Sequence, residues 1–202
     1  MKTRSHPGKK SVRVIGGTSR GRRLHTPRGL SVRPTSDKVK EALFNILAGM
    51  LGPLEGCAVL DIFAGTGNLG IEALSRGAKS AVFIDSNRDS TAIISKNLSL
   101  TGFTDRSRVI LKDFSHALGK LESAGDVFQL IIIDPPYQKG LTEKCLELLQ
   151  KSTIVDEQTV VIAEYSSRED IADCHGCLQQ IDKRVYGDTA LAFFTTMQKG
   201  SN

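Results

Sequence analysis

Runs of apolar residues alternate along the chain with segments in which apolar positions recur every three or four residues. The runs are typical of buried strands and lie at 57–62, 80–85, 108–113, 128–134 and 159–165. Helical spacing follows them, as in "LGIEALSRG" after the first run and "TEKCLELLQKS" after the fourth. Strands that alternate with helices favour a parallel sheet covered by helices on both faces. The chain is therefore predicted to be an α/β protein with a Rossmann-like fold.

Both ends of the chain depart from this alternation. Apolar segments at 181–186 and 190–196 flank the turn sequence "YGDT", which predicts a C-terminal antiparallel hairpin and brings the mainly parallel sheet to seven strands. Near the other end, "RPTSDKVKEALFNILAGML" predicts a helix capped by Thr35 or Ser36. Residues 12–32 predict short strands or turns. We therefore expect a small N-terminal extension over 1–52 and an α/β domain over 53–202.

Charge is distributed unevenly between these two parts. Residues 1–40 contain 12 Lys and Arg and one acid, so they carry +11, whereas the rest of the chain carries −6. Structure-forming residues are interspersed in this basic segment, which favours a folded phosphate-binding surface over a solvated tail. The candidate contacts to RNA are Arg20, Arg22, Arg23 and Arg33, although Arg33 could instead line the ligand pocket.

No apolar stretch approaches the roughly 18 residues of a membrane span, and no apolar region follows the basic N-terminus. These features predict a cytoplasmic protein that does not contact membranes. Its four cysteines are expected to be reduced thiols. Cys174 and Cys177 form a C-x-x-C without a second pair at suitable spacing, so we expect a loop before the last strands and no metal site.

An acid closes four of the predicted strands: Asp61, Asp85, Asp113 and Asp134. The carboxyl ends of parallel strands lie at one edge of the sheet, where ligands bind. Four like charges at one edge predict a ligand that is rich in hydroxyl and amino donors.

The loop "DIFAGTGNLG" narrows the choice of ligand. Gly65, Gly67 and Gly70 match G-x-G-x-x-G, a pattern that dinucleotide-binding domains share, and Asp85 could hold a ribose in either case. Asp61 would repel a pyrophosphate at the helix N-terminus. The same carboxylate suits an ammonium group, such as that of the methionine part of S-adenosylmethionine, and we favour this cofactor over NAD.

The sequence Asp134-Pro135-Pro136-Tyr137 predicts chemistry on an amine. The lone pair of a nucleobase amine is delocalised into the ring, which makes the amine a poor nucleophile. Asp134 and a backbone carbonyl of the prolines could accept its N–H groups and aim the lone pair at a methyl carbon, while the prolines fix the geometry. Tyr137 would stack on a base extruded from its helix.

These motifs, together with "RVIGGTSRGRRL", "VRPTSDKVKEALFNIL" and "YGDTALAFF", resemble the bacterial RsmD family of class I methyltransferases over about residues 12–197. The resemblance implies transfer of a methyl group from S-adenosylmethionine to the exocyclic N2 of one guanine of 16S rRNA (nucleotide 966 in the usual rRNA numbering) in the small ribosomal subunit. It implies that Asp61, Phe63, Gly65 and Gly67 form the methionine loop. Further along the chain, Asp85 would hold the ribose, Asp113 and Phe114 would meet the adenine, and Asp134 to Tyr137 would hold the base.

Other functions remain compatible with the sequence. A DNA adenine-N6 or cytosine-N4 methyltransferase would use the same DPPY motif, but 202 residues leave little room for a target-recognition domain. Protein-glutamine methylation would not need the basic segment. A non-catalytic RNA-binding module would not need to retain the glycine loop and DPPY. We expect the enzyme to be a monomer.

Overall fold

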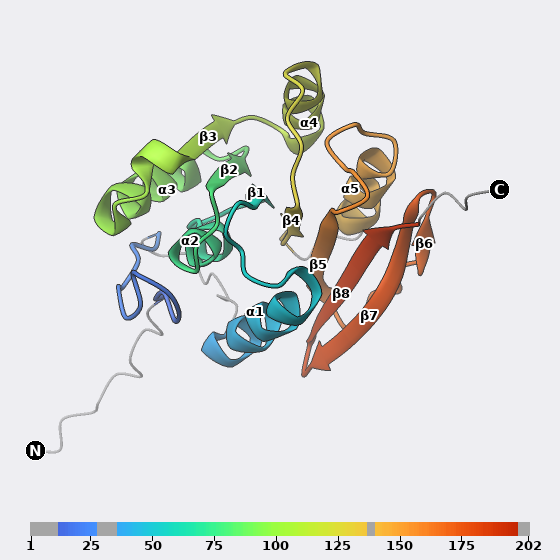
Figure 1. The fold of residues 1–202 in the computed structure, drawn as a ribbon, viewed down its shortest axis with the longest axis horizontal. Coiled ribbons are helices and arrows are strands. Elements are labelled where there is room, and N and C mark those ends of the chain that lie inside the picture. Colours follow the sequence, from blue (N-terminus) through green and yellow to red (C-terminus); the bar gives the residue numbers. More distant parts are fainter. Residues whose placement is uncertain (1–11, 28–35, 137–139, 198–202) are drawn as a thin grey trace, which may run out of the picture.

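A single mixed sheet forms the centre of the molecule in the computed structural model, which describes residues 12–27, 36–136 and 140–197 (Figure 1). Its strand order is β3-β2-β1-β4-β5-β8-β7-β6. The parallel part comprises β1 (Ala58–Ile62), β2 (Ser80–Asp85), β3 (Ser107–Leu111), β4 (Leu130–Ile133) and β5 (Val160–Ser166). The antiparallel part comprises β8 (Thr189–Thr196), β7 (Leu178–Tyr186) and β6 (Cys174–His175). The Rossmann-like sheet and its C-terminal hairpin are confirmed.

The sheet has one strand more than the seven we predicted. Cys174 and His175 pair with Gln179 and Leu178 and form the short edge strand β6, so the expected loop at this point is wrong. His175 is buried beside Phe194, with 5.9 Å between the ring centroids, and this contact holds the segment against the sheet. Cys174 and Cys177 are exposed free thiols.

Helices cover both faces of the sheet (Figure 1). The helices are α1 (Asp37–Leu51), α2 (Asn68–Ser75), α3 (Arg88–Thr101), α4 (Phe114–Ser123) and α5 (Leu141–Leu149), with a short 3₁₀ turn η1 (Thr104–Arg106). Side chains from α1, α2 and α3 pack with one set of strand residues, and those from α4 and α5 pack with the alternate set. In the part of the chain that the structure describes, no helix is long and apolar enough to cross a membrane.

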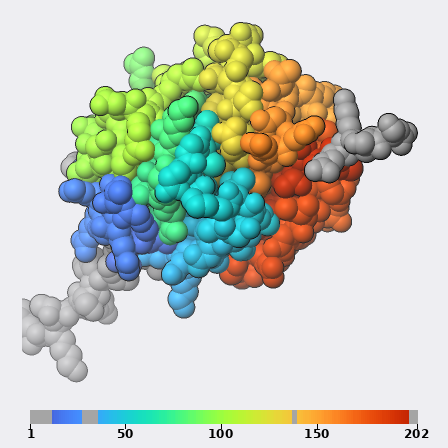
Figure 2. Space-filling model, viewed as in Figure 1, coloured from blue at the N-terminus to red at the C-terminus, as the bar shows by residue number. Residues whose placement is uncertain are grey.

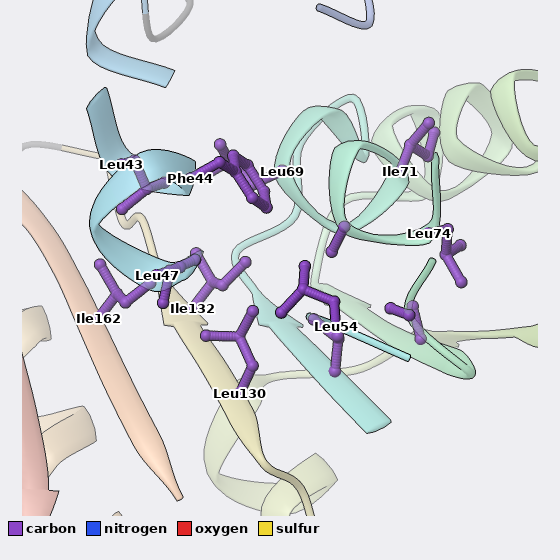
Figure 3. Close-up of a cluster of buried hydrophobic side chains, with 14 of the residues drawn as sticks. Leu43, Phe44, Leu47, Leu54, Leu69, Ile71, Leu74, Leu130, Ile132 and Ile162 are labelled. Atoms are coloured by element: carbon purple, nitrogen blue, oxygen red, sulfur yellow. The ribbon is translucent and has the colours of Figure 1, made fainter. Parts of the chain in front are cut away.

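Helix α1 is part of the main core and is not detached from it. Ser36 caps the helix by accepting a hydrogen bond from the Val39 backbone N–H at 3.3 Å. Leu43 and Leu47 are fully buried, and Figure 3 shows them directed towards Ile132 and Ile162 of the sheet. The apolar stripe that predicted this helix therefore covers β4 and β5.

The N-terminal segment, residues 12–27, also packs on the domain (Figure 2). Its buried residues Val12, Val14 and Leu24 belong to the same core cluster as α1 and α2. The segment turns back on itself, with an antiparallel bridge between Arg13 and Arg23. Gly17, at a φ of 71°, lies so close to α2 that an added Cβ would stand 1.7 Å from the Ser75 carbonyl oxygen. The position of the segment is therefore fixed by close backbone contact with α2.

Candidate active site

The order of the parallel strands reverses between β1 and β4, since β2 and β3 lie on one side of β1 and β4 and β5 on the other. In open α/β sheets, ligands bind at this reversal, outside the carboxyl ends of the strands. Asp61 lies on β1, and Asp134 directly follows β4, where its backbone N–H donates to the Ile62 carbonyl at 3.4 Å. The structure thus brings two of the predicted site residues together where this fold holds its ligands.

Asp61 is 2% exposed and lies on the α2 face of the sheet. Its Oδ2 accepts a hydrogen bond from the Gly70 backbone N–H at 2.9 Å, so it also satisfies a donor in the first turn of α2. Burial raises the pKa of Asp61 to about 7; the Gly70 hydrogen bond acts against the shift and the charge of Asp85 adds to it. A cation beside this carboxylate would offset its burial, so the site fits an ammonium group.

The glycine loop between β1 and α2 has two kinds of glycine. Gly65 and Gly67 have φ values of 55° and 77°, which residues with a side chain rarely adopt. Gly70 is needed for a different reason, because an added Cβ would stand 2.4 Å from the Phe83 ring and 3.0 Å from Asp61 Oδ2. The first two glycines shape the loop, and the third lets α2 pack closely on β1 and β2.

Asp85, at the end of β2, holds this loop in place. Its Oδ2 accepts from the Gly65 backbone N–H at 2.9 Å, and its Oδ1 accepts from the Asn87 backbone N–H at 2.8 Å. An ionised carboxylate has about four lone-pair positions, so Asp85 retains the capacity to accept from hydroxyl groups.

Asp113 lies beyond the end of β3, not on the strand as we predicted. It is the N-cap of α4, where its side chain accepts from the Ser115 backbone N–H at 3.0 Å. The hydrogen bond from the Ser115 hydroxyl is the main cause that lowers the pKa of Asp113. The strand ends at Leu111 because the capping geometry requires Asp113 to leave the sheet.

Phe63, which follows β1, contacts Phe114, the first residue of α4. Their ring centroids are 5.0 Å apart, and Phe114 is only 4% exposed. Phe63 has a φ of 64° and is, among the described residues, the one non-glycine residue with a positive φ. Such strained conformations cluster at functional sites. The pair therefore forms an apolar wall beside the glycine loop, next to the exposed carboxylate of Asp113.

Asp134 and Glu164 are neighbours on the part of the site that lies at the carboxyl ends of β4 and β5. Ile133 pairs with Ala163, so the next residues, Asp134 and Glu164, lie side by side. Burial raises the pKa of Asp134 well above its usual value, and the charges of Glu164 and Asp61 add to the effect. Glu164 was not among the predicted site residues, although a single acid within the apolar run "VVIAEYS" was a visible signal.

The two prolines of the DPPY motif differ in exposure. Pro135 is buried and Pro136 is exposed. Tyr137 and Arg33, two further predicted site residues, lie outside the described residues.

A buried polar network behind the glycine loop was also missed. Lys40 of α1 and Glu72 of α2 form an ion pair of 3.2 Å, and both side chains are at most 1% exposed. Lys40 Nζ also donates to Asn68 Oδ1 at 2.7 Å, and the Glu72 carboxylate accepts from the backbone N–H groups of Ile15 and Gly16 at 2.8 and 2.7 Å. The network joins the N-terminal segment to the first turns of α2.

Asn97 of α3 makes a second connection between the N-terminal segment and the glycine loop. Its side chain accepts from the His25 backbone N–H at 2.7 Å and donates to the Thr66 carbonyl at 2.8 Å. The side chain is fully buried. The segment and the loop are therefore positioned by the same helix.

Arg20, Arg22 and Arg23 are exposed on the N-terminal segment, as a phosphate-binding surface requires. Arg20 lines a pocket of about 210 Å³ between this segment and α1, together with Arg13 and Arg76. Two of the basic residues counted in the sequence do not act as free surface charges, since Lys40 is buried against Glu72 and Arg13 pairs with Asp37 at 2.9 Å. Lys40 therefore does not add to the exposed positive charge of residues 1–40, whereas the pairing of Arg13 with Asp37 is already included in their net charge of +11.

Known proteins share this architecture over most of their length. The family described as conserved hypothetical protein 95 matches residues 12–195. The ribosomal RNA small subunit methyltransferase D of Escherichia coli (strain K12) is 37% identical over 81% of this chain and 79% of its own. YlbH of Bacillus subtilis (strain 168) is 35% identical over 91% of this chain and 98% of its own. The solved structure of yhhF from Escherichia coli superposes with a TM-score of 0.80 at 31% identity and covers 94% of this chain and 99% of its own.

The match includes the N-terminal segment, the glycine loop, the DPP sequence and nearly all of the C-terminal hairpin, so it reaches every element described above. The chain belongs to the conserved hypothetical protein 95 family, the RsmD family of class I methyltransferases.

Proposed function

We propose that the protein transfers a methyl group from S-adenosylmethionine to the exocyclic N2 of a guanine in 16S rRNA. The position of Asp134 beside Asp61, at the reversal of the strand order, is the observation that carries this proposal. The name of the relative from Escherichia coli supports small-subunit rRNA as the substrate. Identification of the nucleoside methylated in small-subunit RNA tests it.

The cofactor supplies an electrophilic methyl group when it is bound. Asp61 would pair with the ammonium of its methionine part, and Asp85 would accept from the ribose hydroxyls. Asp113 and the wall of Phe63 and Phe114 would lie against the adenine. These assignments rest on the placement of the residues along one edge of the sheet.

Asp134 would accept an N–H of the guanine amine, so that the lone pair is localised on N2 and directed at the methyl carbon. The methyl group supplied by the cofactor would form an N–C bond at N2 as its S–C bond is broken. The proton that leaves N2 would pass to the Asp134 carboxylate, whose raised pKa makes it a better proton acceptor than an ordinary aspartate. We infer that the protein acts as a monomer on the small-subunit particle.

Cofactor affinity is expected to fall below pH 7. The pKa of Asp61 is about 7 in the free protein, so at lower pH the ammonium can pair with Asp61 only after a proton leaves. The dissociation constant should rise by up to about tenfold per pH unit between pH 7 and 5. Calorimetric titration in buffers of different ionisation enthalpy should show proton release on binding.

The same raised pKa affects the stability of the ligand-free protein. The stabilising contribution of Asp61 is largest at pH values below its ordinary pKa of 3.8 and disappears as the pH rises through about 7.

Asp61→Asn is the matched control for the predicted pH dependence of cofactor affinity, because it retains an acceptor for the Gly70 N–H and has no charge. Cofactor binding should be weaker in this variant and independent of pH; a wild-type affinity that does not change from pH 7 to 5 would remove Asp61 from the cofactor site.

Removal of charge at Arg20, Arg22 and Arg23 is expected to weaken RNA binding. Replacement of all three by Gln should flatten the dependence of log K on log salt by about 0.7 to 0.9 for each phosphate that the protein no longer neutralises. Filter binding at several salt concentrations measures this slope. A variant with Lys120, Lys151 and Arg168 replaced by Gln is the control, since these exposed residues lie outside the N-terminal segment. Equal slopes for the two variants would place the RNA elsewhere.

A further inference from the structure

The proposed function leaves open how the site distinguishes guanine from other bases that carry an amine. Adenine and cytosine also present an exocyclic amine, and the acceptors of the DPP sequence alone do not tell these amines apart. Guanine carries a hydrogen on N1, one of the two ring nitrogens next to its amine. The ring nitrogen next to the amine in adenine (N1) and in cytosine (N3) carries a lone pair instead.

Glu164 lies where it can read this difference. It is the neighbour of Asp134 across the parallel pair of β4 and β5, one residue beyond the pair of Ile133 and Ala163. Strand alternation places Glu164 on the same face as Ile162, which packs with α1 and α2, because Ala163 and Tyr165 belong to the opposite core. Asp61 lies on this face too, since it contacts α2.

Side chains on two adjacent strands can converge on the neighbouring donors of guanine, N1–H and the N2 amine. Neighbouring strands lie about 4.8 Å apart, so side chains at adjacent positions can reach adjacent groups on one base edge. The charge of Glu164 contributes to the raised pKa of Asp134, which is consistent with this proximity. Glu164 is 5% exposed, so a base that reached it would be removed from water and the contact would be strongly selective.

We propose that Glu164 determines specificity for guanine by accepting the N1–H while Asp134 accepts an N–H of the neighbouring amine. Adenine or cytosine in the same position would present a lone pair to the Glu164 carboxylate, and this contact is repulsive. This role rests on the proposed function, because it concerns the same pocket and the same base. It also explains why an amine-methylating DPP sequence need not act on adenine.

The test compares two RNA substrates on two enzymes. Small-subunit particles assembled on synthetic RNA carry either guanine or 2-aminopurine at the target position; 2-aminopurine keeps the amine but has a lone pair at N1. The wild type should prefer guanine by at least about tenfold in kcat/KM. Glu164→Gln should reduce that preference by about tenfold, since its amide can donate to the N1 lone pair. Cofactor affinity and thermal unfolding of the variant are measured alongside.

The outcomes separate the two proposals. A wild type that forms no N2-methylguanosine overturns the proposed function and the role of Glu164 together. A wild type that methylates guanine in this RNA and 2-aminopurine equally well overturns the role of Glu164 alone, without reference to any variant. A variant that is slower on both substrates by the same factor overturns it as well, because a purely structural role of Glu164 would leave the preference unchanged.

Discussion

Asp134→Ala is expected to lower methyl transfer by about 10²- to 10⁴-fold, the range for the loss of a general base. The reason is that Asp134 would both localise the lone pair of the amine and receive its proton. Cofactor affinity should stay close to that of the wild type, because Asp61 and Asp85 are untouched. Single-turnover transfer to undermethylated small-subunit RNA measures the rate, and calorimetry measures the affinity.

Asp134→Asn is the matched control for this result. The amide retains an oxygen that accepts from the amine but cannot take up its proton, so its rate should lie between those of the wild type and Asp134→Ala. Both substitutions remove a charge from a crowded group of carboxylates and should not destabilise the protein. Full residual activity in Asp134→Ala would exclude Asp134 from the chemistry, even if the cofactor still bound.

Glu72→Ala is expected to cost about 3 to 5 kcal/mol of unfolding free energy, the range for breaking a buried ion pair. The substitution leaves the buried Lys40 ammonium without its carboxylate and leaves the backbone N–H groups of Ile15 and Gly16 without an acceptor. Burial lowers the pKa of Lys40, and Glu72 is the main group that opposes this shift. Urea unfolding with a constant m-value measures the loss.

The exposed ion pair between Arg108 and Asp126 is the control for this prediction. It is 2.6 Å long with side chains 48% and 28% exposed, so Asp126→Ala should cost no more than about 1 kcal/mol. Because Glu72 also anchors residues 15 and 16, its removal should increase protease cleavage of the N-terminal segment before global unfolding. Equal costs for the two substitutions would contradict a stabilising role for the buried network.

The architecture was predictable from the sequence because the apolar runs and the helical segments alternate without interruption. The α1 stripe and the "YGDT" turn were equally direct signals, and both elements occur as expected. The position of Asp113 was not predictable in the same way. A single Asp after an apolar run is compatible with both a strand end and a helix N-cap. Here Asp113 is the N-cap, because the Ser115 backbone N–H and hydroxyl group donate to its carboxylate.

The polar residues of the core were harder to predict because their partners are distant in the sequence. Lys40 was counted with the basic surface, yet it is buried and forms an ion pair with Glu72, which lies 32 residues further along the chain. Glu72 and Glu164 are each a single acid in an apolar stretch, a pattern that signals a buried charge but does not reveal its partner. Only the packing of α1 on α2, and of β4 beside β5, shows which groups meet.

The placement of Asp61 illustrates how one residue serves two purposes. The sequence suggested a ligand for an ammonium, and the structure adds that the same carboxylate accepts the Gly70 N–H of α2. Because one oxygen holds the helix, the orientation of the carboxylate is fixed before any ligand binds. Preorganisation of this kind lowers the cost of binding a charged group.

The decisive experiment identifies the nucleoside that the protein methylates. The protein is incubated with isotope-labelled S-adenosylmethionine and small ribosomal subunits that lack this methylation, and the labelled RNA is digested to nucleosides and separated. We predict a single labelled product, N2-methylguanosine, that forms much more slowly when Asp134→Ala replaces the wild type. Label in N6-methyladenosine, or no label in RNA from a protein that binds the cofactor, would contradict the proposed function.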